Sequence, residues 1–179
     1  MTSLVSYTPL PIAPAALREL RAADDSGRPV RPFTAREAGD PAGAPVDAVG
    51  SPLRCCLRAV EPGERIALVS YAPLRRWAAE HGAEPGAYDE AGPVFVHAAE
   101  CAGPAASAGY PFLRAGALRT VRRYDARGRI VGGRLVELTG TPDTSLDQAL
   151  DEAFTDPRVR VAHVRAVEYG CFHFEVRRP

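Results

Sequence analysis

The sequence contains no lysine and no asparagine, so all 22 of its basic residues are arginine. Without a lysine amine, the chain cannot form a Schiff base with a carbonyl substrate or with pyridoxal phosphate, and it has no phosphate-loop lysine. The 22 acidic residues balance the arginines, and no run of like charge occurs. The chain therefore lacks the positive patch of a protein that binds nucleic acid or an anionic membrane.

Long apolar runs are missing as well. No stretch approaches the roughly 20 apolar residues that a membrane-spanning helix needs, and residues 1–13 contain prolines but no basic leader. The four cysteines are expected to be free thiols, because a chain of 179 residues in a reducing compartment needs no disulfides. We expect a cytoplasmic protein with a small-molecule ligand and without nucleic-acid or membrane partners; a homodimer is left open.

The order of the predicted elements indicates an α+β fold, a single domain over residues 1–179 with a mainly antiparallel β-sheet and two or three helices. Pro14–Ala23 and Thr144–Phe154 have the apolar spacing of helices, and Thr144 can cap the second one. Pro73–Glu84 fits a shorter amphipathic helix.

Strands are predicted where apolar and polar residues alternate, with hairpin turns at Pro62-Gly63 and at Asp125–Gly128. The predicted strands are Leu53–Val60, Arg65–Tyr71, Pro93–His97, Leu118–Tyr124 and Arg129–Leu138. Glycines 132 and 133 indicate a bulge or a close backbone approach. Residues 24–51 are dense in glycine and proline and are expected to be mostly loop, with one strand near Arg31–Arg36.

The closing segment, Val161–Arg177, is the first candidate for a functional site. A three-residue loop ending at Gly170 would pair Arg165 with His173 and His163 with Glu175. Because successive strand residues face opposite sides, this register would gather the polar side chains on one face, and a two-residue turn would not. The polar side chains are His163, Arg165, Cys171, His173, Glu175 and Arg177.

Such a face suits acid–base or thiol chemistry on a small anionic metabolite. An arginine binds a carboxylate, a histidine moves protons, and a glutamate orients the imidazole. A cysteine beside histidine and arginine gains thiolate character and can act as the nucleophile. The candidate catalytic residues are His163, Arg165, Cys171, His97 and Glu90. The candidate substrate-binding residues are Arg54, Tyr71, Tyr88, His173 and Tyr169.

A zinc or iron site is a weaker alternative, because imidazole and thiolate are suitable ligands but the short paired spacings of zinc modules are absent. Its candidate ligands are His97, Cys101, His163, Cys171 and His173. On a strand, the adjacent Cys55 and Cys56 would face opposite sides, so at most one of them is expected to join a site. No cofactor and no metal ligand is therefore predicted.

A non-catalytic protein that binds a small molecule or a partner is the third hypothesis. Most aromatic residues follow strand alternation and are expected to fill the core, whereas Tyr88 and Tyr169 are the ones expected to use their hydroxyl groups. A pocket enclosing His163, Arg165 and Cys171 would favour catalysis, and a flat apolar patch would favour a partner.

Several motifs in combination resemble one known family. They are SPLRCCLR from Ser51, EPGE from Glu61, YAP from Tyr71, YDEAGPVFVH from Tyr88, RYD from Arg123, HVR from His163 and GCF from Gly170. From Ser51 to Arg177 the chain is similar to the bacterial family numbered 1203 among domains of unknown function. The resemblance implies a small soluble bacterial protein and assigns no catalytic residue. The stretch Arg75–Gly86 is longer than expected for the family and could form a lid or a decoration.

Overall fold

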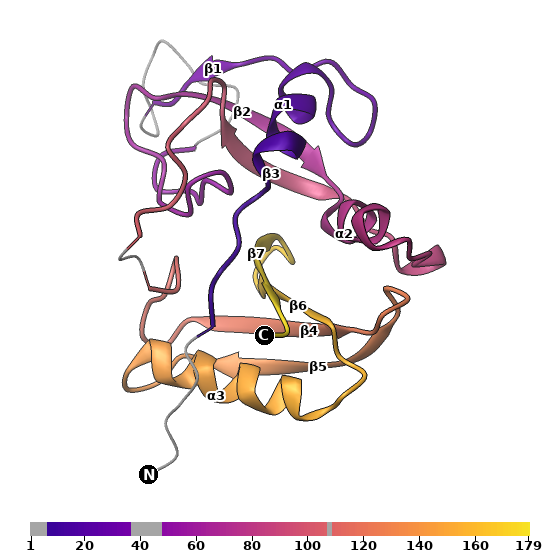
Figure 1. Cartoon of the computed structure of the whole chain (residues 1–179). Helices are drawn as coiled ribbons and strands as arrows, with labels where there is room; N and C mark the ends of the chain where they lie inside the picture. The colour runs from indigo at the N-terminus through magenta and orange to yellow at the C-terminus, as the bar shows by residue number, and fades with distance from the viewer. Residues whose placement is uncertain (1–6, 37–47, 107–108) are drawn as a thin grey trace. The chain divides into compact units, whose positions relative to one another are not determined.

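The computed structural model describes residues 7–36, 48–106 and 109–179. The chain divides into two compact units, each with helix and antiparallel sheet (Figure 1). The predicted α+β fold, mainly antiparallel and with two or three helices, is confirmed, since the described residues contain three α-helices. The domain range 1–179 stays a prediction. Unit 1 comprises Met1–Leu10, Pro73–Glu90 and Gly109–Pro179, and unit 2 comprises Pro11–Ala72 and Ala91–Ala108.

Unit 2 contains a helix and a three-stranded antiparallel sheet in the order β1-β2-β3. Its elements are α1 (Pro14–Ala22), β1 (Phe33–Thr34), β2 (Arg65–Tyr71) and β3 (Gly92–His97). Val94 and Val96 of β3 are buried, whereas the alternate residues Phe95 and His97 are only partly buried. Because of this alternation, the partly buried His97 lies at the end of the strand, on the side opposite to the two core valines.

Unit 1 contains a four-stranded antiparallel sheet in the order β5-β4-β6-β7. Its elements are α2 (Pro73–His81), the 3₁₀ turn η1 (Gly86–Tyr88), β4 (Leu118–Tyr124), β5 (Ile130–Glu137), α3 (Pro142–Thr155), β6 (Val161–Ala166) and β7 (Phe172–Arg177). Helix α3 lies along β4 and β5 (Figure 1) and buries its apolar stripe, which includes Leu146 and Leu150. The apolar stripe of the helix is therefore packed against the edge strand β5 and its neighbour β4, as the spacing of the helix residues requires.

The three predicted helices are present, with one correction at a cap. Helix α3 begins at Pro142, and Thr141 occupies the N-cap without a side-chain hydrogen bond. Thr144 lies inside the helix, so its predicted capping role is wrong. Proline is favoured in the first helical turn because it has no N–H to leave unpaired, and it starts this helix earlier than the threonine does.

The segment Leu53–Val60 was predicted as a strand, and this prediction is wrong. Residues 54–56 form a turn, in which the Leu57 N–H donates to the Leu53 carbonyl (3.0 Å) and the Leu53 N–H donates to the Arg58 carbonyl (2.8 Å). Strand β2 therefore pairs with β1 and β3 rather than with this segment. Alternation over eight residues cannot distinguish a strand from a tight loop whose polar and apolar residues happen to alternate.

The hairpin at Asp125–Gly128 is confirmed. The Asp125 carboxylate accepts hydrogen bonds from the backbone N–H groups of Arg127 and Arg129, both at 2.9 Å. A register shift lies between Arg123 and Tyr124 on β4. A Cβ atom placed on Gly132 would lie 2.5 Å from Nη2 of Arg123, so the predicted close approach at this glycine is also present.

The closing hairpin has the predicted pair of His163 with Glu175, and Gly170 has the expected positive φ of 66°. A register shift after Val164 then places Arg165 opposite Phe172. The predicted pair of Arg165 with His173 is therefore wrong. An irregularity inside a strand changes which residues face each other, and the alternation of the sequence does not reveal it.

None of the helices in the three described ranges combines the length and the apolar character needed to cross a membrane. In the region 24–51, strand β1 lies within the predicted Arg31–Arg36 stretch. Residues 37–47 of this region lie outside the described residues.

Candidate metal centre

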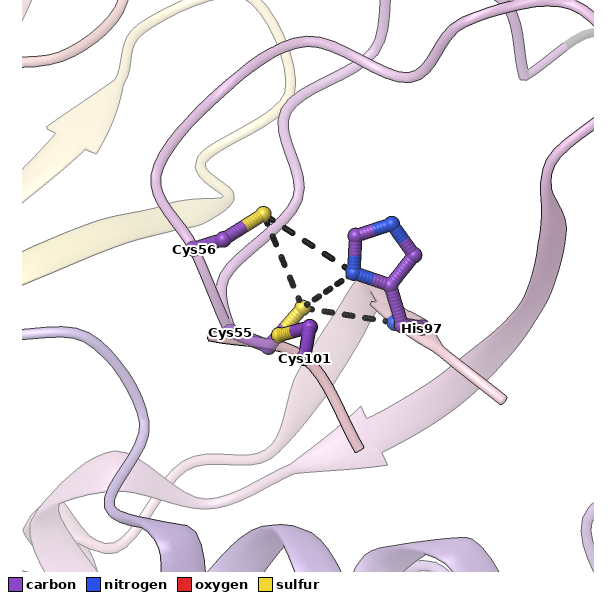
Figure 2. Close-up of side chains that lie close together, drawn as sticks. All are labelled: Cys55, Cys56, His97 and Cys101. Atoms are coloured by element: carbon purple, nitrogen blue, oxygen red, sulfur yellow. Dashed lines mark hydrogen bonds between the residues drawn. The ribbon is translucent and has the colours of Figure 1, made fainter. Parts of the chain in front are cut away.

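Four side chains of unit 2 point toward one another at the end of β3 (Figure 2). They are Cys55, Cys56, His97 and Cys101. Their three sulfur atoms and one ring nitrogen all lie within 4.8 Å of one another. Two buried cysteines, one half-buried cysteine and a partly buried histidine thus share one small volume.

The distances fit a tetrahedral zinc ion. The Cys55 Sγ lies 4.0 Å from the Cys56 Sγ, and the Nδ1 of His97 lies 3.3 Å from the first sulfur and 3.8 Å from the second. With Zn–S bonds of about 2.3 Å and Zn–N bonds of about 2.0 Å, neighbouring ligand atoms of a tetrahedron are about 3.5–3.8 Å apart. The three atoms therefore already have nearly the spacing that the ion would require.

The local backbone explains how these residues meet. His97 is the last residue of β3 and pairs with Ile66 on β2. The Arg54 N–H donates to the Phe95 carbonyl (2.9 Å), which holds the turn with the two cysteines beside β3. Cys101 lies four positions after His97 along the chain. The sheet thus brings together sulfur atoms from segments more than forty positions apart in the sequence.

The turn that carries the two cysteines has an unusual backbone. Leu57 has a φ of 57°, in the left-handed region that residues with a side chain rarely adopt. Strained backbone of this kind persists where the surrounding structure imposes it, and it is concentrated at functional sites. The conformation closes the turn so that both adjacent cysteines face the imidazole, which a strand would not allow.

A carboxylate and a guanidinium lie on the side of the His97 ring that faces away from the sulfur atoms. The Nε2 of His97 lies 3.1 Å from an Oε1 of Glu64, and Arg58 binds the same carboxylate, with Nη1 3.1 Å from the Oε2. The hydrogen bond from Arg58 lowers the pKa of Glu64 to about 2, so this group is an ionised acceptor at neutral pH. A hydrogen bond from Nε2–H to this carboxylate would leave the lone pair of Nδ1 facing the sulfur atoms, as in histidines that bind a metal.

The thiols are arranged so that one of them ionises readily. The hydrogen bond from the Cys55 thiol lowers the pKa of Cys56 to about 6, and the same bond, together with burial, raises the pKa of Cys55. The backbone N–H of His97 also donates to the Cys55 Sγ (3.3 Å). Thiolate is the form that binds metals and acts as a nucleophile, so both chemistries are open to this cluster.

Of the predicted site residues, the structure brings His97 and Cys101 together, as the metal hypothesis expected. The expectation that at most one of Cys55 and Cys56 joins a site is wrong, because both lie in a turn and not on a strand. The prediction missed these two cysteines and also Glu64 and Arg58. The adjacent cysteine pair could have indicated the site. Both cysteines can face the same group only because they lie in a turn, and the alternating pattern of this segment predicted a strand instead.

Most of the other predicted site residues lie in unit 1. One of them, His163, is part of the core. His163 is completely buried, and its Nε2 lies 3.3 Å from the Oε2 of Glu175. Rings of Tyr124 and Phe172 lie 4.8 and 5.2 Å from its ring. Burial lowers the pKa of His163, so the imidazole is neutral at pH 7. Phe172 thus interrupts the predicted polar face.

Arg165 and Glu90 pair with each other and do not orient an imidazole. The Nη2 of Arg165 lies 3.0 Å from the Oε2 of Glu90, and Arg122 binds the other oxygen of the same carboxylate. The Cys171 thiol points to the Tyr169 carbonyl (3.7 Å), and within the described residues it has no hydrogen bond to histidine or arginine. The role of Cys171 as a nucleophile stays a prediction.

The predicted substrate-binding residues do not form one group. Arg54 is buried and donates to the Pro52 carbonyl, and Tyr71 is buried at the end of β2. His173 is buried, and the centroid of its ring lies 5.4 Å from that of the Phe112 ring in an edge-to-face arrangement. Tyr88 and Tyr169 are exposed. Arg54 and Tyr71 belong to unit 2 and the other three to unit 1.

The profile of one family, described as "Protein of unknown function (DUF1203)", matches residues 50–178, and the chain therefore belongs to this family. The resemblance inferred from the motifs is thus confirmed. No curated protein and no solved structure matched the chain. The matched range contains all four residues of the cysteine and histidine cluster.

Proposed function

We propose that this protein binds one zinc ion through Cys55, Cys56, His97 and Cys101. The observation that carries the proposal is the convergence of three sulfur atoms and one imidazole nitrogen within 4.8 Å of one another. Three thiolates and one imidazole form a ligand set that suits zinc. Glu64 supports it, because a carboxylate bound at Nε2 would hold the His97 ring with Nδ1 toward the sulfur atoms.

A zinc ion at this place would link the turn at residues 54–57 to the end of β3 and to the loop that follows. A site with four protein ligands is closed, and closed sites contribute to folding rather than to catalysis. The cysteines would be reduced in such a site, and reduced cysteines are typical of the cytoplasm, where we place the protein.

Native mass spectrometry tests the proposal when combined with the denatured mass and with metal analysis by inductively coupled plasma mass spectrometry. We expect a native mass excess of about one zinc ion per chain, lost on treatment with a strong chelator. A chain that is isolated without metal, and that does not take up zinc when all thiols are reduced, would exclude the proposal.

A thiol enzyme that acts on a small anionic metabolite is the second candidate, and one observation favours it. A cysteine, a histidine and a glutamate are aligned, with 3.8 Å from the Cys56 Sγ to Nδ1 of His97 and 3.1 Å from Nε2 to Glu64. This is the order of nucleophile, base and orienting group in covalent catalysis. Three thiols around one imidazole exceed what this chemistry needs, which is why we prefer zinc. Rapid alkylation of one cysteine in the metal-free protein would support the enzyme.

A further inference from the structure

A cavity of about 450 Å³ lies within unit 2, next to the cysteine and histidine cluster. One wall comes from α1 and the segment before it, and another from residues 100–104. Cys55 and Cys101 also line it, so the cavity and the cluster share two side chains. Its volume falls in the range of about 300–1,000 Å³ that is usual for small-molecule sites.

Two arginines of α1 give this cavity its charge. Arg18 and Arg21 are three positions apart, so they lie on one face of the helix, and both line the cavity. The Nε of Arg21 donates to the His97 carbonyl (3.1 Å), which fixes the guanidinium beside the cluster. Within the described residues neither arginine has a carboxylate partner. Glu100 is the one acidic side chain in the lining, so the charges leave a positive excess.

The remaining lining is mostly apolar. Ile12, Leu17 and three prolines contribute hydrocarbon surface, and Ile12 and Leu17 are buried residues of the unit. An apolar wall beside two guanidinium groups is complementary to a ligand with a hydrocarbon body and one anionic end. A planar guanidinium matches a carboxylate through two parallel hydrogen bonds. A ligand with several negative charges would be repelled by Glu100 in the lining.

We infer that this cavity binds a small carboxylic acid with an apolar body, whose carboxylate is held by Arg21 and Arg18 next to Cys55 and Cys101. The site goes beyond the proposed zinc centre, because nothing in its arginines or its apolar wall depends on the metal. Its position places the bound acid directly beside the sulfur atoms of the cluster. The class of ligand thus follows from the charge and shape of the cavity. The bound ligand would lie next to the reactive groups of unit 2.

The test is a titration with hexanoate, followed by saturation-transfer difference NMR, with 1-hexanol as an uncharged probe of similar size. We expect saturable binding of hexanoate and no comparable binding of the alcohol. Arg21→Gln should weaken hexanoate binding about tenfold or more, and Arg18→Gln, whose arginine is exposed, about threefold. Arg65→Gln, an exposed arginine of the same unit outside the cavity, serves as the matched control and should bind like the wild type.

Two further variants keep the test independent of folding. Arg21→Lys retains the charge and should bind hexanoate more tightly than Arg21→Gln. Ala102→Phe adds bulk to the lining without touching an arginine and should block the probe. Equal binding of hexanoate and 1-hexanol, or unchanged binding by both Arg21→Gln and Ala102→Phe, would overturn the inference.

Zinc content, measured for every variant, separates this inference from the proposed function. A chain that holds zinc and does not bind hexanoate would overturn the inference and leave the zinc centre intact. A chain that binds hexanoate through Arg21 without holding zinc would support the inference and exclude the zinc centre.

Discussion

Each unit of the molecule contains a histidine that is bound to a glutamate, and the two pairs differ in what lies at the other ring nitrogen. His97 binds Glu64 at 3.1 Å, and His163 binds Glu175 at 3.3 Å, in both cases through Nε2. Each glutamate also pairs with an arginine, Arg58 or Arg177. Nδ1 of His97 faces two sulfur atoms, whereas the buried Nδ1 of His163 has no hydrogen-bond partner in the described structure.

A histidine and glutamate pair does not by itself define a functional site. His163 is surrounded by the rings of Tyr124 and Phe172, and its burial keeps it neutral. Among the described residues, its Nδ1 has no hydrogen-bond partner. His97 has the same carboxylate support, but its Nδ1 faces two thiols, so the groups around the second nitrogen decide what the pair can do.

The largest expected effect is the loss of zinc from variants of the cysteine pair. Cys55→Ser or Cys56→Ser removes a thiolate ligand, and the zinc content of the purified protein should fall from about one ion per chain to near zero. Cys171→Ser, in unit 1, is the matched control and should retain the metal. Metal analysis by mass spectrometry decides, and equal zinc content in all three variants would exclude the proposed centre.

The second prediction concerns the histidine and glutamate pair in unit 1. His163→Ala should lower the free energy of unfolding by about 3 kcal/mol, because it leaves a cavity and removes a partner of the buried Glu175. Urea unfolding measures the loss. Zinc content should not change, and a parallel loss of zinc would show that the two pairs are not independent.

A smaller effect is expected from the carboxylate that supports His97. Glu64→Gln retains a hydrogen-bond acceptor but removes the charge, and the affinity for zinc should fall about 10- to 100-fold. Competition with a chromophoric chelator gives this affinity. Glu175→Gln, the equivalent change in the other pair, should leave the affinity for zinc unaltered.

The smallest effect concerns pH. Burial holds the pKa of His163 below its ordinary value of 6.5. Below pH 6.5 the imidazole of His163 binds a proton more readily in the unfolded chain than in the folded chain. The free energy of unfolding should therefore decrease as the pH falls from 7 to 5. His163→Gln cannot titrate, and we expect its stability to vary less over this range in urea unfolding experiments. An identical pH dependence in both proteins would contradict the assignment.

The hydrogen bonds to Glu175 act at lower pH. Burial works to raise its pKa, but the bonds from His163 and Arg177 hold the pKa below the ordinary value of 4.5. Stability from this group is therefore present above pH 4.5 and is lost as the pH falls through the lowered pKa. His163→Gln keeps the contribution of Arg177, so part of this acid dependence should remain.

Local patterns predicted the elements well and their partners less well. The apolar spacing of α1 and α3 and the turn at Asp125–Gly128 are properties of short segments, and they were correct. The segment Leu53–Val60 alternated like a strand but is a loop, and with that error the place of its two cysteines was lost. The pair of Arg165 with His173 failed for a similar reason, because a register shift depends on the packing of both strands.

The family, the α+β class, the helices and the set of reactive groups follow from the sequence, in which every basic side chain is a guanidinium and the thiols are few. Which histidine meets the thiols depends on the tertiary structure. Cys56 and His97 are 41 positions apart, and the turn that joins them depends on the bond from the Arg54 N–H to Phe95 on β3. Such contacts are set by the packing of distant segments, which no local periodicity records.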